Sequence, residues 1–213
     1  MGDIVVIDYG MGNLRSVAKA IEHVAETKVI VTSDAVKIQQ ADRVVFPGQG
    51  AIGSAMEHMR ERDLVEVLHK VAREKPFLGI CLGLQALMTH SDEDGGIDCL
   101  DLIPGQVHHF DNLFQSEKID SAALKIPHMG WNQVRQTVPH PLWADIDDNS
   151  RFYFVHSYYI QPEHKNEIAG TTCYGADFVS AAGADNWFAV QFHPEKSQHA
   201  GLQLLKNFVH WNV

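Results

Sequence analysis

The chain has 213 residues, 45% hydrophobic and 21% charged, which is the composition of a globular protein with a substantial core. Seventeen Lys and Arg against 27 Asp and Glu give a formal net charge of −10, which argues against non-specific nucleic-acid binding and favours small molecules or proteins as partners. No stretch has the length and apolarity of a membrane span, and the amino end lacks the pattern of a secretory signal. The three cysteines form no C-x-x-C pair, so we expect a protein of the reducing cytoplasm.

Strands alternate with helices through the first ninety or so residues. Apolar runs at residues 4–7, 28–31, 44–46 and 77–80 are typical of buried strands. Apolar residues also recur at helical spacing after the run at 4–7 and again before the run at 77–80. This alternation predicts an α/β fold with a doubly wound, mostly parallel central sheet flanked by helices. Because ligands bind at the carboxyl ends of such strands, the loops that hold Asn13, Gly50 and Cys81 should face one cleft. Asn13 is also a candidate cap for the first helix.

The pattern changes beyond residue 89, where prolines and glycines separate short extended segments. These segments predict an antiparallel extension of the sheet: 106–110, 131–134, 151–155, 168–172, 178–181 and 188–192. A terminal helix should bury Leu202, Leu205, Phe208 and Val209. No repeat or linker divides the chain, so we expect a single domain over residues 1–213.

Cys81 stands where a buried strand meets a helix, between Gly79 and Gly83. A cysteine on such a tight turn presents its sulfur at the carboxyl edge of the sheet, and the following helix N-terminus favours the thiolate. The glycines allow the sharp turn and leave room for a substrate, as in the nucleophile elbow of α/β hydrolases. We therefore interpret Cys81 as a nucleophile, with a buried structural cysteine as the alternative.

A thiolate nucleophile needs a base, and the base needs a group that orients it. His193 and Glu195 follow a predicted strand and, on an extended chain, would project to the same side. Taken alone, a His-Pro-Glu tripeptide is more often a turn, but together with the cysteine turn it favours a Cys-His-Glu triad. The other histidines show no metal-ligand spacing, and we expect neither a metal nor a cofactor. Cys99 and Cys173 receive no role.

Main-chain amides are the expected donors to an oxyanion. Gly48, Gln49 and Gly50 end the third strand and can turn an amide into the cleft, and the amide of Leu82 is the natural second donor. Taken alone, this Pro-Gly-x-Gly segment is equally a strand-ending turn. Gln85, one helical turn beyond Cys81, either contacts substrate or is a solvated helix residue.

The segments 79–85 and 193–195 resemble the class I, triad-type glutamine amidotransferases. Further segments at 8–17, 127–132, 153–158 and 193–197 are similar to the glutaminase subunits of imidazole glycerol phosphate synthase, and the resemblance runs nearly end to end. One departure is Gln49, where the oxyanion loop of the family commonly carries valine.

The resemblance implies a glutaminase that forms a heterodimer with a (β/α)₈-barrel cyclase in histidine biosynthesis. Ammonia from glutamine would pass to the cyclase, which would make imidazole glycerol phosphate and aminoimidazole-carboxamide ribonucleotide. The resemblance also gives Cys81, His193 and Glu195 as the triad. It places Gln85, Glu93, Ser157 and Tyr158 against glutamine, and Asn13, Trp131 and Lys196 against the cyclase.

Three other functions stay open on the residues alone. They are a sister amidotransferase that serves another synthase, a catalytically silent binding protein, and a general cysteine hydrolase, because a triad by itself does not name its leaving group.

Overall fold

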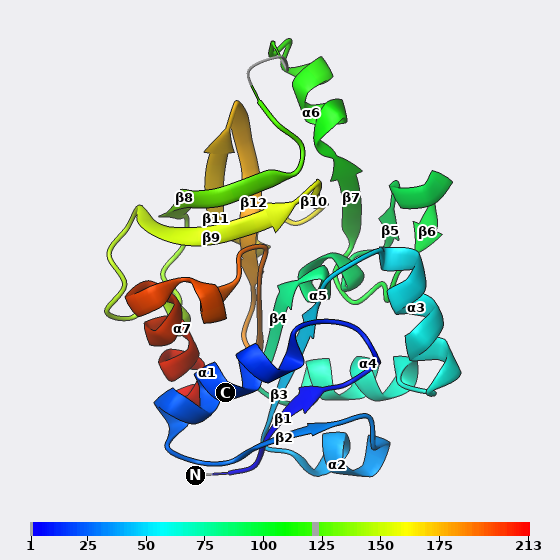
Figure 1. Ribbon diagram of the computed structural model, residues 1–213, viewed down its shortest axis with the longest axis vertical. Coiled ribbons are helices and arrows are strands. Elements are labelled where there is room, and N and C mark those ends of the chain that lie inside the picture. Colours follow the sequence, from blue (N-terminus) through cyan, green and yellow to red (C-terminus); the bar gives the residue numbers. More distant parts are fainter. Residues whose placement is uncertain (1, 121–123) are drawn as a thin grey trace.

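The computed structural model describes residues 2–120 and 124–213, and its strands form one large mixed sheet (Figure 1). The main path of the sheet runs β2-β1-β3-β4-β13-β12-β10-β7-β5-β6, with β11, β8 and β9 branching from β12. The strands are β1 Ile4–Ile7, β2 Val29–Thr32, β3 Arg43–Gly48, β4 Phe77–Cys81, β5 His90–Ser91, β6 Ile97–Asp98, β7 Gly105–His109, β8 His128–Gln136, β9 Ser150–His156, β10 Tyr158–Pro162, β11 Ile168–Tyr174, β12 Ala176–Gly183 and β13 Trp187–Val190.

Seven α-helices lie in the described part of the chain: α1 Leu14–Ala25, α2 Ala35–Gln40, α3 Ile52–Glu61, α4 Val65–Glu74, α5 Leu82–Ala86, α6 Phe110–Ser116 and α7 Gln198–His210. Short 3₁₀ turns cover Glu93–Gly95, Pro141–Trp143, Lys165–Glu167 and Pro194–Lys196. Among the described residues, no helix has both the length and the apolar character that crossing a bilayer requires.

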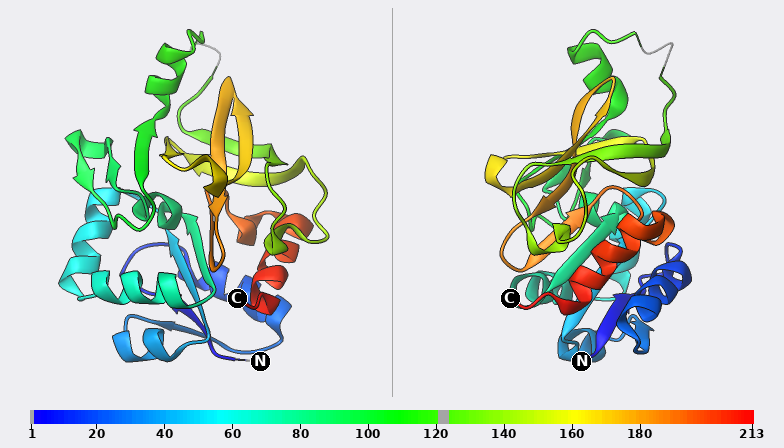
Figure 2. Two further views of the ribbon diagram at one scale, coloured as in Figure 1. Left: turned by 180° about the vertical axis from the view of Figure 1, so that it is seen from behind. Right: turned by 90° about the vertical axis from the view of Figure 1, so that its left-hand side faces the viewer.

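The sheet separates two apolar cores. Helices α1 and α7 contribute to one core together with the β8–β9 hairpin, and α2, α3 and α4 contribute to the other (Figures 1 and 2). Both faces of β1, β3 and β4 are therefore covered, which explains why each of these strands is a continuous apolar run.

The predicted fold class is confirmed. Strands β1, β2, β3, β4 and β13 pair in parallel, and β12 joins β13 in antiparallel orientation to start the extension. The extension is not wholly antiparallel, because the short β5 pairs with β7 in parallel.

Several local predictions need correction. Asn13 precedes α1, but its side chain makes no capping hydrogen bond. In α7 it is Leu204 that is buried, while Leu202 is only half-buried. The last predicted strand ends at Val190, and α3 carries a helical apolar pattern that was not among the predicted helices.

Gly83 lets helix α5 approach strand β3 closely. A Cβ atom at this position would lie 1.9 Å from the main-chain oxygen of Phe46, a distance that no side-chain movement can relieve. The first turn of α5 therefore rests directly on β3, and this contact fixes where the chain leaves Cys81.

We predict that Gly83→Ala destabilises the protein by about 3 kcal/mol, because the backbone must separate to admit the methyl group. Gly53→Ala in α3 is the matched control, since its Cβ would meet only Ile97 atoms at 3.5 Å and beyond. The control should change stability by no more than about 1 kcal/mol, in the stabilising direction. Urea denaturation measures both variants, and equal stabilities would contradict the packing argument.

Candidate active site

Cys81 has a left-handed backbone conformation, with φ 57° and ψ −108°, between β4 and α5. Non-glycine residues rarely adopt a positive φ, and such strain is characteristic of functional turns. The residue is only 6% exposed and lies at the carboxyl end of β4, opposite Gly48 of β3. The sulfur therefore stands at the predicted edge of the sheet.

His193 and Glu195 meet each other at the same edge. The Nδ1 atom of His193 lies 2.9 Å from Oε1 of Glu195, and their side chains are only 6% and 2% exposed. The extended segment assumed from the sequence is wrong, because Pro194–Lys196 forms a 3₁₀ turn. The turn still brings the carboxylate to the ring, and a carboxylate at Nδ1 leaves Nε2 free to act.

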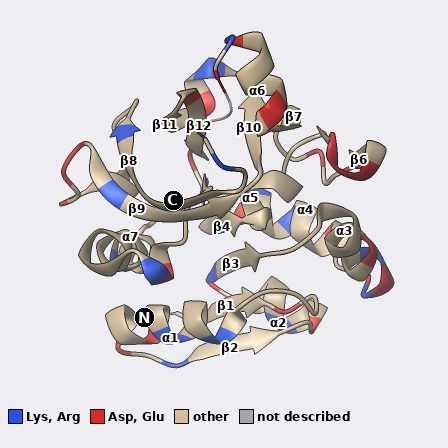
Figure 3. Ribbon diagram, turned by 45° about the horizontal axis from the view of Figure 1, so that its top comes forward, with Lys and Arg blue, Asp and Glu red and all other residues tan. Residues whose placement is uncertain are grey.

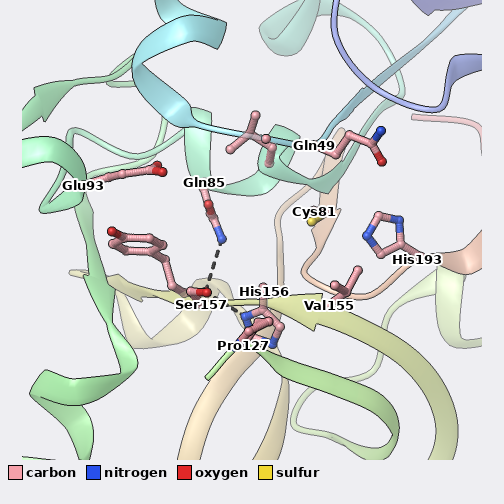
Figure 4. Close-up of a pocket in the computed structure, with 12 residues that line it drawn as sticks. Gln49, Cys81, Gln85, Glu93, Pro127, Val155, His156, Ser157 and His193 are labelled. Carbon is pink, nitrogen blue, oxygen red and sulfur yellow. Dashed lines mark hydrogen bonds between the residues drawn. The ribbon is translucent and has the colours of Figure 1, made fainter. Parts of the chain in front are cut away.

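The His193 ring and the Cys81 sulfur point toward one another (Figure 4). The Nε2 atom of His193 is buried and makes no hydrogen bond to any described residue. Burial alone would lower the pKa of His193, but its interactions with the neighbouring Cys81 and Glu195 side chains raise it to about 10. The His193 ring is therefore an imidazolium at neutral pH, beside the Cys81 sulfur.

A pocket of about 330 Å³ opens over the cysteine. It is lined by Gln49, Gly50, Cys81, Leu82, Gln85, Glu93, Pro127, Val155, His156, Ser157, Tyr158 and His193. Most of these residues come from the elbow, from the loop after β3, and from the end of the β8–β9 hairpin with the start of β10 (Figure 4). Glu93 comes from the 3₁₀ turn Glu93–Gly95, and His193 directly precedes the turn Pro194–Lys196. The size suits a small polar molecule such as an amino acid.

The loop after β3 forms one wall of this pocket. Gln49 and Gly50 line it, and Gly50 has a φ of +100°, which residues with side chains rarely adopt. Gly48 pairs with Cys81 across the strands, and a Cβ there would clash with the Tyr9 hydroxyl. The start of this loop therefore lies beside Cys81. The Tyr9 and Leu82 side chains leave no space for a side chain at position 48.

The four residues predicted to hold glutamine all line the pocket. The Nε2 atom of Gln85 lies 3.0 Å from Oε1 of Gln191 and 3.2 Å from the carbonyl oxygen of Tyr158. Both amide hydrogens of Gln85 are thus engaged within the protein, which leaves only its oxygen for a substrate.

Glu93 lies on the opposite wall of the pocket. One carboxylate oxygen accepts a hydrogen bond of 2.9 Å from the amide of Ile52 at the start of α3. Burial raises the pKa of Glu93 from its ordinary value, and the hydrogen bond from Ile52 opposes this effect. A bound ammonium group would relieve the burial cost of the carboxylate.

The predicted interface residues occupy two places. Asn13 is exposed and borders a small cavity behind the triad, together with Gly48 and Glu195. Trp131 packs edge-on against Tyr153, with ring centroids 6.1 Å apart, and the Lys196 ammonium lies 5.8 Å from the centroid of the same Tyr153 ring. Trp131 and Lys196 therefore share one exposed surface beside the pocket.

Three polar residues near the site were not singled out from the sequence. Gln191 and His156 contact site residues, and His128 contacts His156. Gln191 interrupts the apolar run at 188–192, which was an available signal for an inward-facing polar side chain.

Comparison with known proteins identifies the family. The family model for class I glutamine amidotransferases matches residues 5–211. Imidazole glycerol phosphate synthase subunit HisH of Pseudomonas putida is 55% identical over 100% of this chain and 99% of its own length. The HisH subunit of Hydrogenovibrio crunogenus is 54% identical over 98% of this chain and 96% of its own.

The chain belongs to the HisH family of class I glutamine amidotransferases. Solved structures of other amidotransferases share the HisH fold at low sequence identity. One glutamine amidotransferase is 13% identical, with a TM-score of 0.71 over 97% of this chain and 99% of that one. A glutamine amidotransferase of Thermotoga maritima is 16% identical, with a TM-score of 0.59 over 91% of this chain and 76% of that one.

The raised pKa of His193 predicts a pH-dependent stability. The folded protein holds the His193 proton more tightly than the unfolded chain does, because the pKa of this histidine is near 6.5 in the unfolded chain. The stabilisation is therefore complete below about pH 6.5 and is lost as the pH rises through about 10.

We expect His193→Gln to be less stable than the natural protein at pH 6 and to approach it above pH 10, with the free energy of unfolding measured in urea at several pH values. The exposed His199→Gln is the control and should stay parallel to the natural protein throughout. A constant gap for His193→Gln would show that the proton on this ring contributes nothing to folding.

Proposed function

We propose that this HisH-family chain hydrolyses glutamine through a thioester on Cys81. The thiolate attacks the carboxamide carbon, and the oxyanion that forms accepts hydrogen bonds from main-chain amides of the loop after β3 and of Leu82. The His193 imidazolium gives its Nε2 proton to the departing nitrogen, so ammonia leaves and a γ-glutamyl thioester remains.

The second half of the reaction uses the same groups in reverse. The His193 ring, now neutral, takes a proton from water, and the hydroxide attacks the thioester carbon. The carbon–sulfur bond breaks, which yields glutamate and restores the thiolate and imidazolium. Glu195 keeps the ring oriented and stabilises its positive charge in both halves.

Glutamine fits the pocket in one orientation. Its side-chain carboxamide must reach the sulfur, which leaves the α-amino group for the carboxylate of Glu93 and the α-carboxylate for the Ser157–Tyr158 segment. The observation that supports the proposal most strongly is that Cys81 and His193 line the same pocket, with Glu195 hydrogen-bonded to the far side of the His193 ring.

A cyclase partner follows from the family and from the chemistry of the product. The HisH relatives are named as subunits of imidazole glycerol phosphate synthase, so we propose a heterodimer with the (β/α)₈-barrel cyclase of that enzyme. Ammonia released into neutral water would be protonated and unreactive, whereas a covered pocket would deliver it to the cyclase as a nucleophile. We further propose that residues 1–213 act as one glutaminase domain in the cytoplasm.

The exposed surface of Trp131 and Lys196 is the proposed docking site. Trp131 is 38% exposed and its neighbour Met129 is 61% exposed, which is unusual for large apolar side chains. The strands of the β8–β9 hairpin also carry basic positions, and acidic positions lie on the loop that joins these strands and near β6 (Figure 3).

The decisive experiment is a glutaminase assay of the chain alone and of the chain mixed with the cyclase and its nucleotide. The isolated chain should turn over glutamine slowly and the complex much faster. Cys81→Ala should lower kcat by about 10⁴-fold or more, because no other group can form the thioester. The exposed Cys173→Ala is the control and should retain full activity. Full activity of the isolated natural protein would contradict coupling to a partner.

We predict that Trp131→Ala weakens binding of the cyclase about 30-fold, as for a partly buried aromatic anchor at an interface. Val36→Ala, on the distant helix α2, also truncates an exposed apolar side chain and should leave binding unchanged. Titration calorimetry compares the two variants with the natural protein. Equal affinities for all three would remove the β8–β9 hairpin from the docking site.

A further inference from the structure

Gln191 is a fully buried polar residue that the triad does not use. It follows β13 by one position and is 0% exposed. Its Nε2 atom lies 3.7 Å from the Cys81 sulfur, within hydrogen-bonding range of that larger atom. The sulfur thus has a second polar neighbour in addition to the His193 ring.

The neighbouring contacts decide which end of the Gln191 amide faces the sulfur. The main-chain oxygen of Tyr158 can only accept hydrogen bonds, so the Gln85 atom at 3.2 Å must be the amide nitrogen. The second hydrogen of that nitrogen reaches Oε1 of Gln191 at 3.0 Å. With its oxygen so engaged, Gln191 turns its NH₂ group toward the sulfur.

The same carbonyl orients a second series of groups. Nδ1 of His156 donates to the Tyr158 carbonyl oxygen at 2.7 Å, so its Nε2 must accept, and it lies 2.9 Å from Nδ1 of His128. Nε2 of His128 in turn accepts from Asn132 at 3.2 Å. Burial lowers the pKa of His156 to about 3 and of His128 to about 4, so both rings are neutral.

We infer that Gln191 is a further catalytic residue of the proposed glutaminase, whose amide donates a hydrogen bond to the Cys81 thiolate, and that the Tyr158 carbonyl orients it through Gln85. The inference rests on the proposed function for its role in turnover. An amide N–H stabilises a thiolate more than a neutral thiol and does not lose its proton at working pH. It therefore favours the nucleophile in the resting state and the leaving group when the thioester is cleaved.

The test measures the reaction of Cys81 with iodoacetamide between pH 6 and 9.5, followed by mass spectrometry of the peptide that contains Cys81. Gln191→Met keeps the length of the side chain but cannot donate. Its alkylation rate at pH 7 should fall about tenfold, because a hydrogen bond to a charged group is lost. Gln191→Glu adds a like charge and should react more slowly still.

The control is Gln161→Met, which makes the same replacement at an exposed position of β10. It should react like the natural protein at every pH. For Gln191→Met the profile should shift to higher pH and converge with the natural rate to within about twofold at pH 9.5, where thiolate forms without help. A merely structural defect would instead alter the rate equally at all pH values, and that result, or superimposed profiles, would overturn the inference.

Gln85→Met provides an independent arm. Without the Gln85 amide, Gln191 loses the group that orients it, so alkylation at pH 7 should slow in Gln85→Met, and the double variant should be no slower than Gln191→Met. Additive effects would refute the orienting role of Gln85. This arm also keeps the inference testable if Gln191→Met does not fold, since unchanged alkylation of Gln85→Met would then overturn it.

The alkylation assay needs neither glutamine nor a cyclase, so it separates the inference from the proposed function. A shifted profile without glutaminase activity in the complex would refute the proposed function alone. Glutaminase activity with an unshifted profile would refute the role of Gln191 alone.

Discussion

The site depends on one backbone constraint, the left-handed turn at Cys81. This conformation costs free energy, and the surrounding packing must hold it. Gly83 allows α5 to rest on the Phe46 carbonyl, and a Cβ at Gly79 would lie 2.9 Å from the Ala189 side chain on β13. The strands on both sides of β4 thereby fix the direction in which the sulfur points. Because α5 has only five residues, its dipole is a smaller source of thiolate stabilisation than the groups that face the sulfur.

The fold was predictable where burial leaves a simple pattern. Strands β1, β3 and β4 are covered on both faces, so they read as apolar runs, and their parallel pairing followed from the helices between them. Strand ends were less predictable. Strand β13 ends at Val190, although the Gln191 amide still donates to the Ser180 carbonyl of β12. The Gln191 side chain meets the sulfur of a residue 110 positions away, and no local preference encodes that contact.

The site was predictable only as far as short motifs reach. Cys81, His193 and Glu195 were found because each lies in a recognisable local segment, although the triad was argued from an extended segment and the alternative, a turn, is what the structure has at Pro194–Lys196. The pairing of His128 with His156 depends on the register of β8 and β9, and the Gln85–Gln191 contact joins residues 106 positions apart. A single sequence contains no direct record of such register, so these contacts required coordinates.

The Tyr158 carbonyl has a consequence for protein engineering. Every residue type carries this oxygen, so no exchange of the side chain at position 158 can delete the acceptor that sets the direction of both hydrogen-bonded series. Side-chain substitutions can therefore reverse the direction of these hydrogen bonds only at Gln85, Gln191, His128 or His156. Weakening the acceptor itself would require a change in the main chain, such as an ester or thioamide linkage introduced by chemical synthesis.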